Sequence, residues 1–121
     1  KTKYIKIMIS ILLFILARIL EKPVRTIAFI WAMIRSKDRK DYLDECAISI
    51  DQTGNAFGRY MFNDLFITKD GYKFGVSDET ISSAIGKNRR AGTLSKTGIW
   101  FDKFLDKLDK NHSLKSIEEN P

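Results

Sequence analysis

The feature that most constrains the fold of this chain is an apolar N-terminal third, in which two uncharged runs meet at a charged joint. Residues 7–17 form eleven consecutive positions without a charge, and residues 26–34 form a second run. The joint between them contains Pro23, which lacks an amide hydrogen and suits the first turn of a helix or a kink within one. Neither run reaches the roughly 20 apolar residues that cross a hydrocarbon core about 30 Å thick.

Several arrangements of this segment compete. A signal peptide would explain the lysines before the first run, but Ala17-Arg18-Ile19 is a poor cleavage site and the apolar character resumes after it. A single kinked span over residues 4–34 would bring four charges near the middle of the bilayer, at about 2.5–3.5 kcal/mol each unless they pair. A pair of buried helices in a soluble assembly is the arrangement without a membrane.

The spacing of the charges at the joint favours an interfacial position. Arg18, Lys22 and Arg25 fall at i, i+4 and i+7 with Glu21 beside them, so all four share one helical face that can remain in water. A shallow hairpin that turns at residues 21–23 is the alternative, because both of its ends would be basic. We therefore predict an apolar helix or helical hairpin over residues 1–35. Its membrane-anchoring side chains would be Ile7, Leu12, Phe14, Leu16, Phe29 and Trp31.

The distribution of charge assigns the basic character of the chain to the same segment. The net charge is +6, but residues 1–40 hold ten Lys and Arg against two acidic residues, whereas residues 41–121 hold eleven against thirteen. Basic residues that flank apolar runs indicate anionic lipid as a partner. Contact with a protein partner, or self-association, would also use the N-terminal segment.

The remainder of the chain predicts a small α-rich domain over residues 42–118, after a charged linker at residues 36–41. Residues 42–50 and 101–108 each carry apolar side chains at helical spacing on one face. Between them, residues 56–75 are rich in aromatics, and Asp70-Gly71 is a turn signal that predicts a short β-hairpin near residues 60–75. The predicted fold class is mainly α. The single cysteine, Cys46, excludes an intramolecular disulfide.

Two motifs in this domain contain residues that could carry chemistry. Ser77 is expected to cap a helix with Asp78 and Glu79 in its first turn, and Gly86, or alternatively Gly92, is expected to end it. Adjacent carboxylates on a helix diverge by about 100°, which is poor geometry for shared acid–base work. Lys87, Arg89 and Arg90 form the basic cluster of this part of the chain and are the candidates for contact with the phosphates of a nucleic acid.

The single histidine, His112, would need carboxylates from elsewhere in the chain to form a metal site. No serine, histidine and aspartate can be assembled into a catalytic group from spacing alone. We therefore predict no catalytic residue, no metal and no cofactor.

The order of several motifs resembles a group of short proteins of tailed phages and prophages. The matching stretches are Asp51-Gln-x-Gly-Asn55, Ser77-Asp-Glu-Thr-Ile-Ser-Ser83, Gly86-Lys87 and Asp109-Lys-Asn-His112-Ser-x-Lys-Ser-Ile117-Glu, so the resemblance covers roughly residues 48–118. The group has Asp-Pro where this chain has Val76-Ser77, and a cysteine where it has Ser113. Residues 60–74 look like an insertion. The resemblance marks Asp78, Glu79, Ser82, Ser83, Gly86 and His112 as motif residues without assigning them a role.

The resemblance implies a phage or prophage origin. Together with the apolar segment, it predicts a membrane-associated accessory protein on the cytoplasmic face of the host inner membrane, or alternatively a component of the virion. The alternative function is a small soluble nucleic-acid-binding module that uses residues 87–90.

Overall fold

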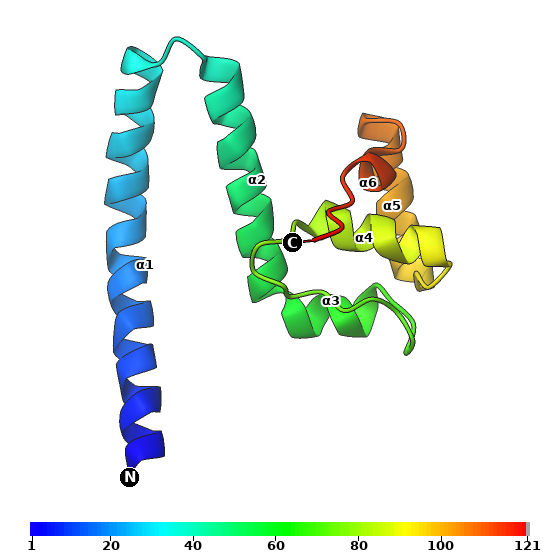
Figure 1. Ribbon diagram of the computed structural model, residues 1–121, viewed down its shortest axis with the longest axis horizontal. Helices are drawn as coiled ribbons and strands as arrows, with labels where there is room; N and C mark the ends of the chain where they lie inside the picture. Colours follow the sequence, from blue (N-terminus) through cyan, green and yellow to red (C-terminus); the bar gives the residue numbers. More distant parts are fainter. Residues whose placement is uncertain (121) are drawn as a thin grey trace. The chain divides into compact units, whose positions relative to one another are not determined.

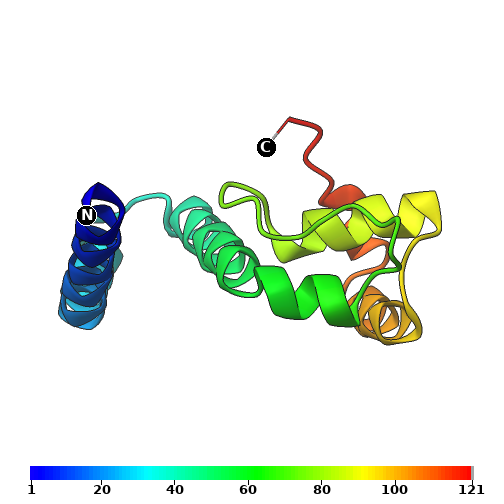
Figure 2. The ribbon, with the colours of Figure 1, turned by 90° about the horizontal axis from the view of Figure 1, so that it is seen from below.

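The computed structural model describes residues 1–120, which form six helices (Figures 1 and 2). They are α1 (Thr2–Arg35), α2 (Arg39–Phe57), α3 (Arg59–Leu65), α4 (Ile81–Ala91), α5 (Lys96–Leu108) and α6 (His112–Lys115). These 120 residues contain no strand, only an isolated antiparallel bridge between Ile67 and Leu94. The predicted mainly α class is confirmed, and the β-hairpin near residues 60–75 is wrong. The chain divides into two compact units, residues 1–42 and the residues from Leu43 onward.

In the first unit, α1 is one continuous helix that passes through Pro23 (Figure 1). The predicted hairpin turning at residues 21–23 is therefore wrong. A proline inside a helix removes one backbone hydrogen bond. Two ion pairs lie beside this weak point: Arg18 Nη1 is 2.7 Å from Glu21 Oε2, and Arg25 binds the other oxygen of Glu21 across the proline.

The connection after α1 is shorter than the expected linker at residues 36–41. Only residues 36–38 lie outside a helix. The Ser36 hydroxyl accepts the Asp38 amide at 3.2 Å and donates to the Asp38 carboxylate at 2.9 Å, which closes a tight turn. Arg39 then donates to the carbonyl of Met33 at 3.0 Å, so the start of α2 is tied to the end of α1.

The second unit has a small apolar core, which consists of Ile67, Phe74, Ala84 and Ile85. Aromatic rings extend it: Phe66 stacks on Phe62 and on Phe101, with centroid distances of 5.1 and 5.2 Å. The aromatic residues of the segment between α3 and α4 thus serve mainly to pack the core.

Asparagine side chains hold the segment between α3 and α4 and explain why it forms no hairpin. Asn88 accepts the Tyr72 amide at 2.8 Å and donates to the Tyr72 carbonyl at 2.9 Å. Asn63 makes the same two bonds with Phe74, at 2.6 and 3.3 Å. Asn55 binds the Gly75 amide and the carbonyls of residues 76 and 79. The backbone groups that a hairpin would pair with a second strand are therefore satisfied by side-chain amides.

The helix boundaries also differ from expectation at α4. Its N-cap is Thr80, whose hydroxyl accepts the Ser83 amide at 3.0 Å, and not Ser77. Glu79 consequently lies before the helix and not in its first turn. Gly86 is inside α4, and the helix ends at Gly92, whose φ of 73° is the left-handed conformation that favours glycine.

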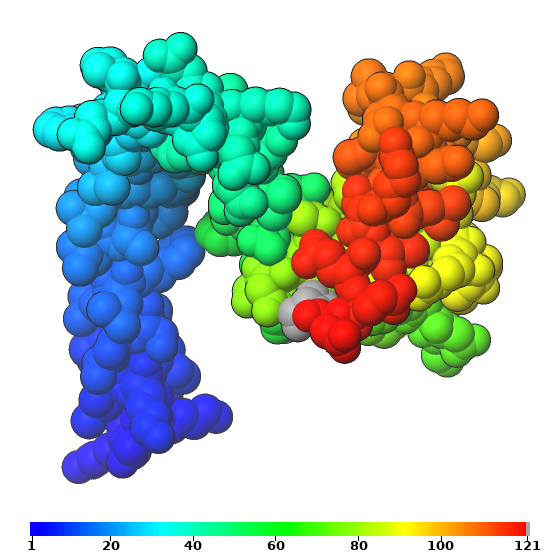
Figure 3. Space-filling view, turned by 45° about the horizontal axis from the view of Figure 1, so that its top comes forward, coloured from blue at the N-terminus to red at the C-terminus, as the bar shows by residue number. Residues whose placement is uncertain are grey.

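Gly86 allows α6 to approach α4 closely. A Cβ built on Gly86 would overlap the carbonyl of Ser113, so only glycine fits between the two helices. Figures 1 and 2 both show α6 lying against α4 and α5. The residues after α6 then run over the surface of the unit (Figure 3), where the Glu118 amide donates to Ser83 and Glu119 pairs with Arg90.

Candidate functional site

The second unit buries more polar residues than apolar ones. Four hydrophobic residues are buried, whereas the buried polar residues are Asn55, Glu79, Thr80, Ser82, Ser83, Asn88, Asp102 and Ser113. Within residues 1–120, every fully buried side-chain nitrogen or oxygen atom has a hydrogen-bond partner. Buried polar networks of this kind either specify a unique packing or form a functional site.

The centre of this network is the carboxylate of Glu79, which is completely buried. One of its oxygens accepts the Tyr72 hydroxyl at 2.7 Å. The other accepts the Ser83 hydroxyl at 2.6 Å and lies 2.6 Å from Lys87 Nζ. Ser83 and Lys87 are four residues apart on one face of α4, and Glu79 immediately precedes the N-cap of that helix, so α4 brings the serine and the lysine to the carboxylate.

Lys87 is largely buried in the same cluster, with 9% of its side chain exposed. Its ammonium lies 3.3 Å from the Tyr72 hydroxyl and 4.4 Å from the centre of the Tyr72 ring. Burial alone lowers the pKa of Lys87, but its bonds to Glu79 and Tyr72 outweigh this effect and raise it. Burial and the hydrogen bond to Glu79 raise the pKa of Tyr72. The cluster therefore contains a charged lysine and a protonated tyrosine at neutral pH.

A second polar group lies beside it, where α4 meets α6. Ser82 Oγ is 3.1 Å from His112 Nε2, and His112 Nδ1 is 3.0 Å from Asp109 Oδ2. The other Asp109 oxygen accepts Lys115 Nζ at 2.7 Å. The bonds from Lys115 and His112 lower the pKa of Asp109. The Ser82 hydroxyl can also donate to Asp51 Oδ2, over a longer distance of 3.4 Å.

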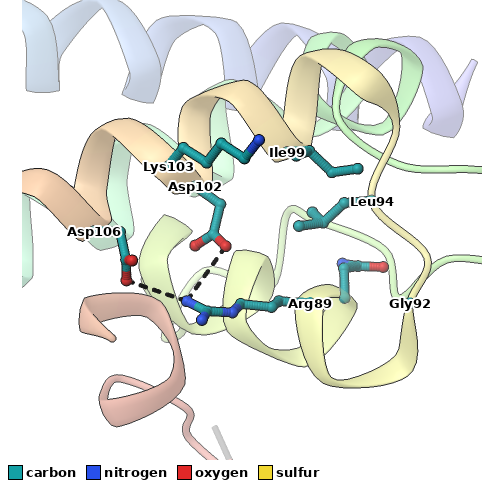
Figure 4. Close-up of a pocket in the computed structure, with 8 residues that line it drawn as sticks. Arg89, Gly92, Leu94, Ile99, Asp102, Lys103 and Asp106 are labelled. Atoms are coloured by element: carbon teal, nitrogen blue, oxygen red, sulfur yellow. Dashed lines mark hydrogen bonds and ion pairs between the residues drawn. The ribbon is translucent and has the colours of Figure 1, made fainter. Parts of the chain in front are cut away.

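The three cations of the basic cluster do not form one patch. Lys87 is bound to Glu79, and Arg90 is paired with Glu119 at 2.9 Å. Arg89 points the other way, toward α5, where its guanidinium lies 3.5 Å from Asp102 and 3.3 Å from Asp106 (Figure 4). Each of the candidate phosphate contacts thus already has an acidic partner within the fold.

Arg89 lines a pocket of about 380 Å³ beside α5 (Figure 4). Asp102 and Asp106 face the guanidinium, and Lys103 lies between them on α5. Asp102 also accepts the Ser113 hydroxyl at 2.5 Å, which ties the pocket wall to α6. Opposite charges within the wall neutralise each other, so this pocket favours no ligand of one charge.

The structure separates the motif residues into distinct groups. Glu79 and Ser83 belong to the lysine cluster, and Ser82 and His112 meet at α6. Gly86 provides the close approach between α4 and α6 described above. Asp78 is exposed and offers its carbonyl to Gln52. No group of three or more His, Cys, Asp or Glu side chains suited to a metal ion occurs in residues 1–120.

Comparison with protein-family models, with curated proteins and with solved structures gave no match to this chain. Fold and site therefore define the class by themselves: a small α-helical protein with a long exposed apolar helix and a second unit organised by buried polar groups.

Sequence reasoning did not show how either polar group assembles, and it did not identify Tyr72 or Asp109 as members. The spacing of Glu79, Ser83 and Lys87 at i, i+4 and i+8 was a readable signal for the first group. Ser82 and His112 are 30 residues apart, and no local pattern indicates that they meet.

Proposed function

We propose that the protein is a membrane-surface accessory protein whose α1 lies along the headgroup region of an anionic bilayer. The observation that carries the proposal is that no residue of this 34-residue helix is buried, although most of its side chains are apolar. A long exposed apolar surface on a protein marks a site of interaction with a membrane or a partner.

The faces of α1 are those of an interfacial helix. At about 100° per residue, the charged side chains of residues 18–25 fall within about 100° of arc. The opposite face carries only apolar side chains along the length of the helix: Ile5, Ile9, Leu12, Leu16, Ile27, Ile30 and Ile34. A helix with one apolar and one charged face lies in the interface plane.

The same geometry refines the set of predicted anchors. Leu12, Leu16 and Trp31 lie on or beside the apolar face. Ile7, Phe14 and Phe29 lie on the side of Arg18 and Arg25, and the Phe29 ring packs against Tyr42 with a centroid distance of 6.2 Å. We assign membrane contact to the first three and to the isoleucines of the apolar face.

Charge supports an anionic surface as the partner. Within α1 the charge of the joint is partly neutralised, because Glu21 binds both Arg18 and Arg25. The uncompensated lysines at the start of α1 and the basic residues at its end attract anionic lipid, at about 1 kcal/mol each near the surface. Among residues 1–120, no helix has both the length and the apolarity that crossing a bilayer requires. With the phage or prophage origin that the resemblance implies, the surface that we propose is the cytoplasmic face of the host inner membrane.

The test compares two matched double variants in co-sedimentation with vesicles. Ile9→Gln/Ile27→Gln alters the middle of the apolar face, and Ile7→Gln/Ile11→Gln makes the same chemical change on the charged face. The isoleucines of the first pair are 50% and 63% exposed. With about 1.5–3 kcal/mol for a fully buried isoleucine, the pair contributes roughly 2–3 kcal/mol, or about 30- to 150-fold in affinity.

We expect the wild-type chain to bind vesicles that contain phosphatidylglycerol and to bind pure phosphatidylcholine vesicles weakly. The first double variant should lose binding and the second should retain most of it. Equal losses in both variants would contradict the interfacial orientation, and a wild-type chain that does not bind phosphatidylglycerol vesicles would contradict the proposal itself.

A further inference from the structure

We propose that Ser82, His112 and Asp109 form a nucleophilic site that cleaves small carboxylic esters by acyl transfer to Ser82. The three residues lie entirely in the second unit and do not involve α1, so this proposal stands independently of membrane association. It rests on two short contacts that His112 makes, one with each of the other residues. Ser82 Oγ lies 3.1 Å from His112 Nε2, and His112 Nδ1 lies 3.0 Å from Asp109 Oδ2. A serine hydrolase group is recognised by this geometry and not by the order of its residues in the chain.

The bonds around His112 set the tautomer that the reaction needs. An ionised carboxylate can only accept a hydrogen bond, so Asp109 takes the hydrogen of Nδ1 and leaves Nε2 of the neutral ring as an acceptor facing Ser82. Lys115 binds the second oxygen of Asp109 and holds it in place. Asn111, which precedes the histidine, adopts a left-handed conformation with φ of 57° and is fixed by bonds to Asp106 and Arg89.

The position of Ser82 on α4 supplies a donor for the developing oxyanion. Ser82 is the second residue of this 11-residue helix. The amides of Ile81 and Ser83 are bonded to Asp51 and Thr80, whereas the Ser82 amide has no acceptor within residues 1–120. The nucleophile's own amide is a known oxyanion donor in serine hydrolases. The hydroxyl has only one hydrogen, and the nearer acceptor is His112 rather than Asp51 at 3.4 Å.

The reaction proceeds in two balanced halves. Ser82 Oγ attacks the ester carbonyl carbon while its proton passes to His112 Nε2, and the carbonyl electron pair moves to oxygen. Collapse of the tetrahedral intermediate breaks the bond to the alcohol, which leaves with the proton from Nε2. Water then gives a proton to the same nitrogen and attacks the acyl-serine carbonyl. The second tetrahedral intermediate collapses and releases the carboxylic acid, and Nε2 returns the proton to Ser82 Oγ.

Exposure limits the substrate to small acyl groups. Ser82 is 7% exposed, whereas the side chains of His112 and Asp109 are 37% and 52% exposed. The acyl group must therefore reach Ser82 from the side of His112. We therefore choose a short unbranched ester, p-nitrophenyl acetate, as the probe.

The test is labelling of the full chain by a fluorophosphonate, followed by intact mass and peptide mapping. We expect one adduct, on Ser82, and an initial burst with p-nitrophenyl acetate that leaves an acetyl group on the same residue. His112→Gln keeps a polar side chain beside Ser82 but cannot accept the proton at neutral pH, and should slow labelling at least about 100-fold. Ser49→Ala, at an exposed serine of α2, is the matched control and should label at the wild-type rate.

The wild-type measurement stands without any variant, and circular dichroism checks that His112→Gln is folded. Absence of any adduct on wild-type Ser82, or an adduct on a different serine, would overturn the proposal. Labelling of Ser82 at the same rate in folded His112→Gln would also overturn it, because the histidine would then not act as the base.

Discussion

Replacement of the buried carboxylate of Glu79 by the amide of glutamine is the sharpest test of how the second unit is held together. The change keeps the size of the side chain and removes only its charge. Lys87, with 9% of its side chain exposed and its ammonium 2.6 Å from Glu79, then becomes a buried charge without a counter-ion. Removing one partner of a buried ion pair costs about 3–5 kcal/mol.

This cost is a large part of the stability of a small unit, which is typically about 5–15 kcal/mol. Two further contacts of the Glu79 carboxylate add to the cost of this substitution. The Tyr72 and Ser83 hydroxyls donate to the Glu79 oxygens at 2.7 and 2.6 Å, and in glutamine one of these oxygens becomes a donor. The neighbouring hydroxyl must then turn to accept from the amide, or the amide faces the Lys87 ammonium, so at least one hydrogen bond is lost at a further cost of roughly 1–3 kcal/mol. We expect a total of about 4 kcal/mol or more.

The assay is a urea titration of the full chain, followed by near-ultraviolet circular dichroism of the packed aromatic rings. Lys87→Met in the Glu79→Gln background completes a double-mutant cycle. Replacement of both charges should recover most of the loss, because a buried pair is often close to neutral against an uncharged pair of similar volume. A loss below about 1 kcal/mol for Glu79→Gln alone would refute the reasoning, since the carboxylate would then not be compensating a buried lysine.

Two further predictions use the same titration. Gly86→Ala would push a methyl group into the Ser113 carbonyl and should lower the free energy of unfolding by about 2 kcal/mol or more. At Gly92 a methyl group meets open space and only the φ of 73° is unfavourable, so Gly92→Ala should cost about 1 kcal/mol. The reverse ranking would contradict the close approach of α6 to α4. The pKa values of Lys87 and Tyr72 are both raised in the folded state, so their contribution is complete below the unfolded values of 10.5 and 10.0 and is lost as the pH rises through the folded values. As the pH rises above the unfolded values, the free energy of unfolding of the wild type should therefore fall more steeply than that of Glu79→Gln/Lys87→Met, and equal slopes would contradict this prediction.

The sequence predicts a helix well where the spacing of apolar side chains alone determines that a helix forms. Phe101 to Leu108 carries a single stripe, and α5 forms there, although it begins earlier, at a cap provided by Ser95. The start of α4 was misplaced because Ser77 and Thr80 can both cap a helix. Tertiary bonds decide between them: Asp51 binds the Ile81 amide and Glu118 binds the Thr80 amide.

The hairpin prediction was wrong for a related reason. Local signals, namely the aromatic residues and Asp70-Gly71, do indicate strands joined by a turn. Whether a strand forms depends on what pairs with its backbone, and here Asn63 and Asn88 take the place of a neighbouring strand. Those bonds join residues 11 and 16 positions apart, which no local pattern encodes.

Most members of the candidate site were identified from the sequence, but Tyr72, Asp109 and the grouping of the residues were not. Glu79, Ser82, Ser83, Gly86 and His112 were all singled out from the sequence. What the sequence does not reveal is that α6 folds back onto α4, and this contact turns a histidine and a serine 30 residues apart into neighbours.

The asparagines that hold the segment between α3 and α4 have a consequence for how this protein can change over evolution. Asn55, Asn63 and Asn88 grip the segment by its amides and carbonyls, which every residue except proline possesses in full. The side chains at exposed positions of the segment, such as Lys69 and Lys73, take no part in these asparagine bonds. Substitutions should accumulate at those positions while the three asparagines are retained. The backbone conformation of the segment would then be kept while its exposed side chains change.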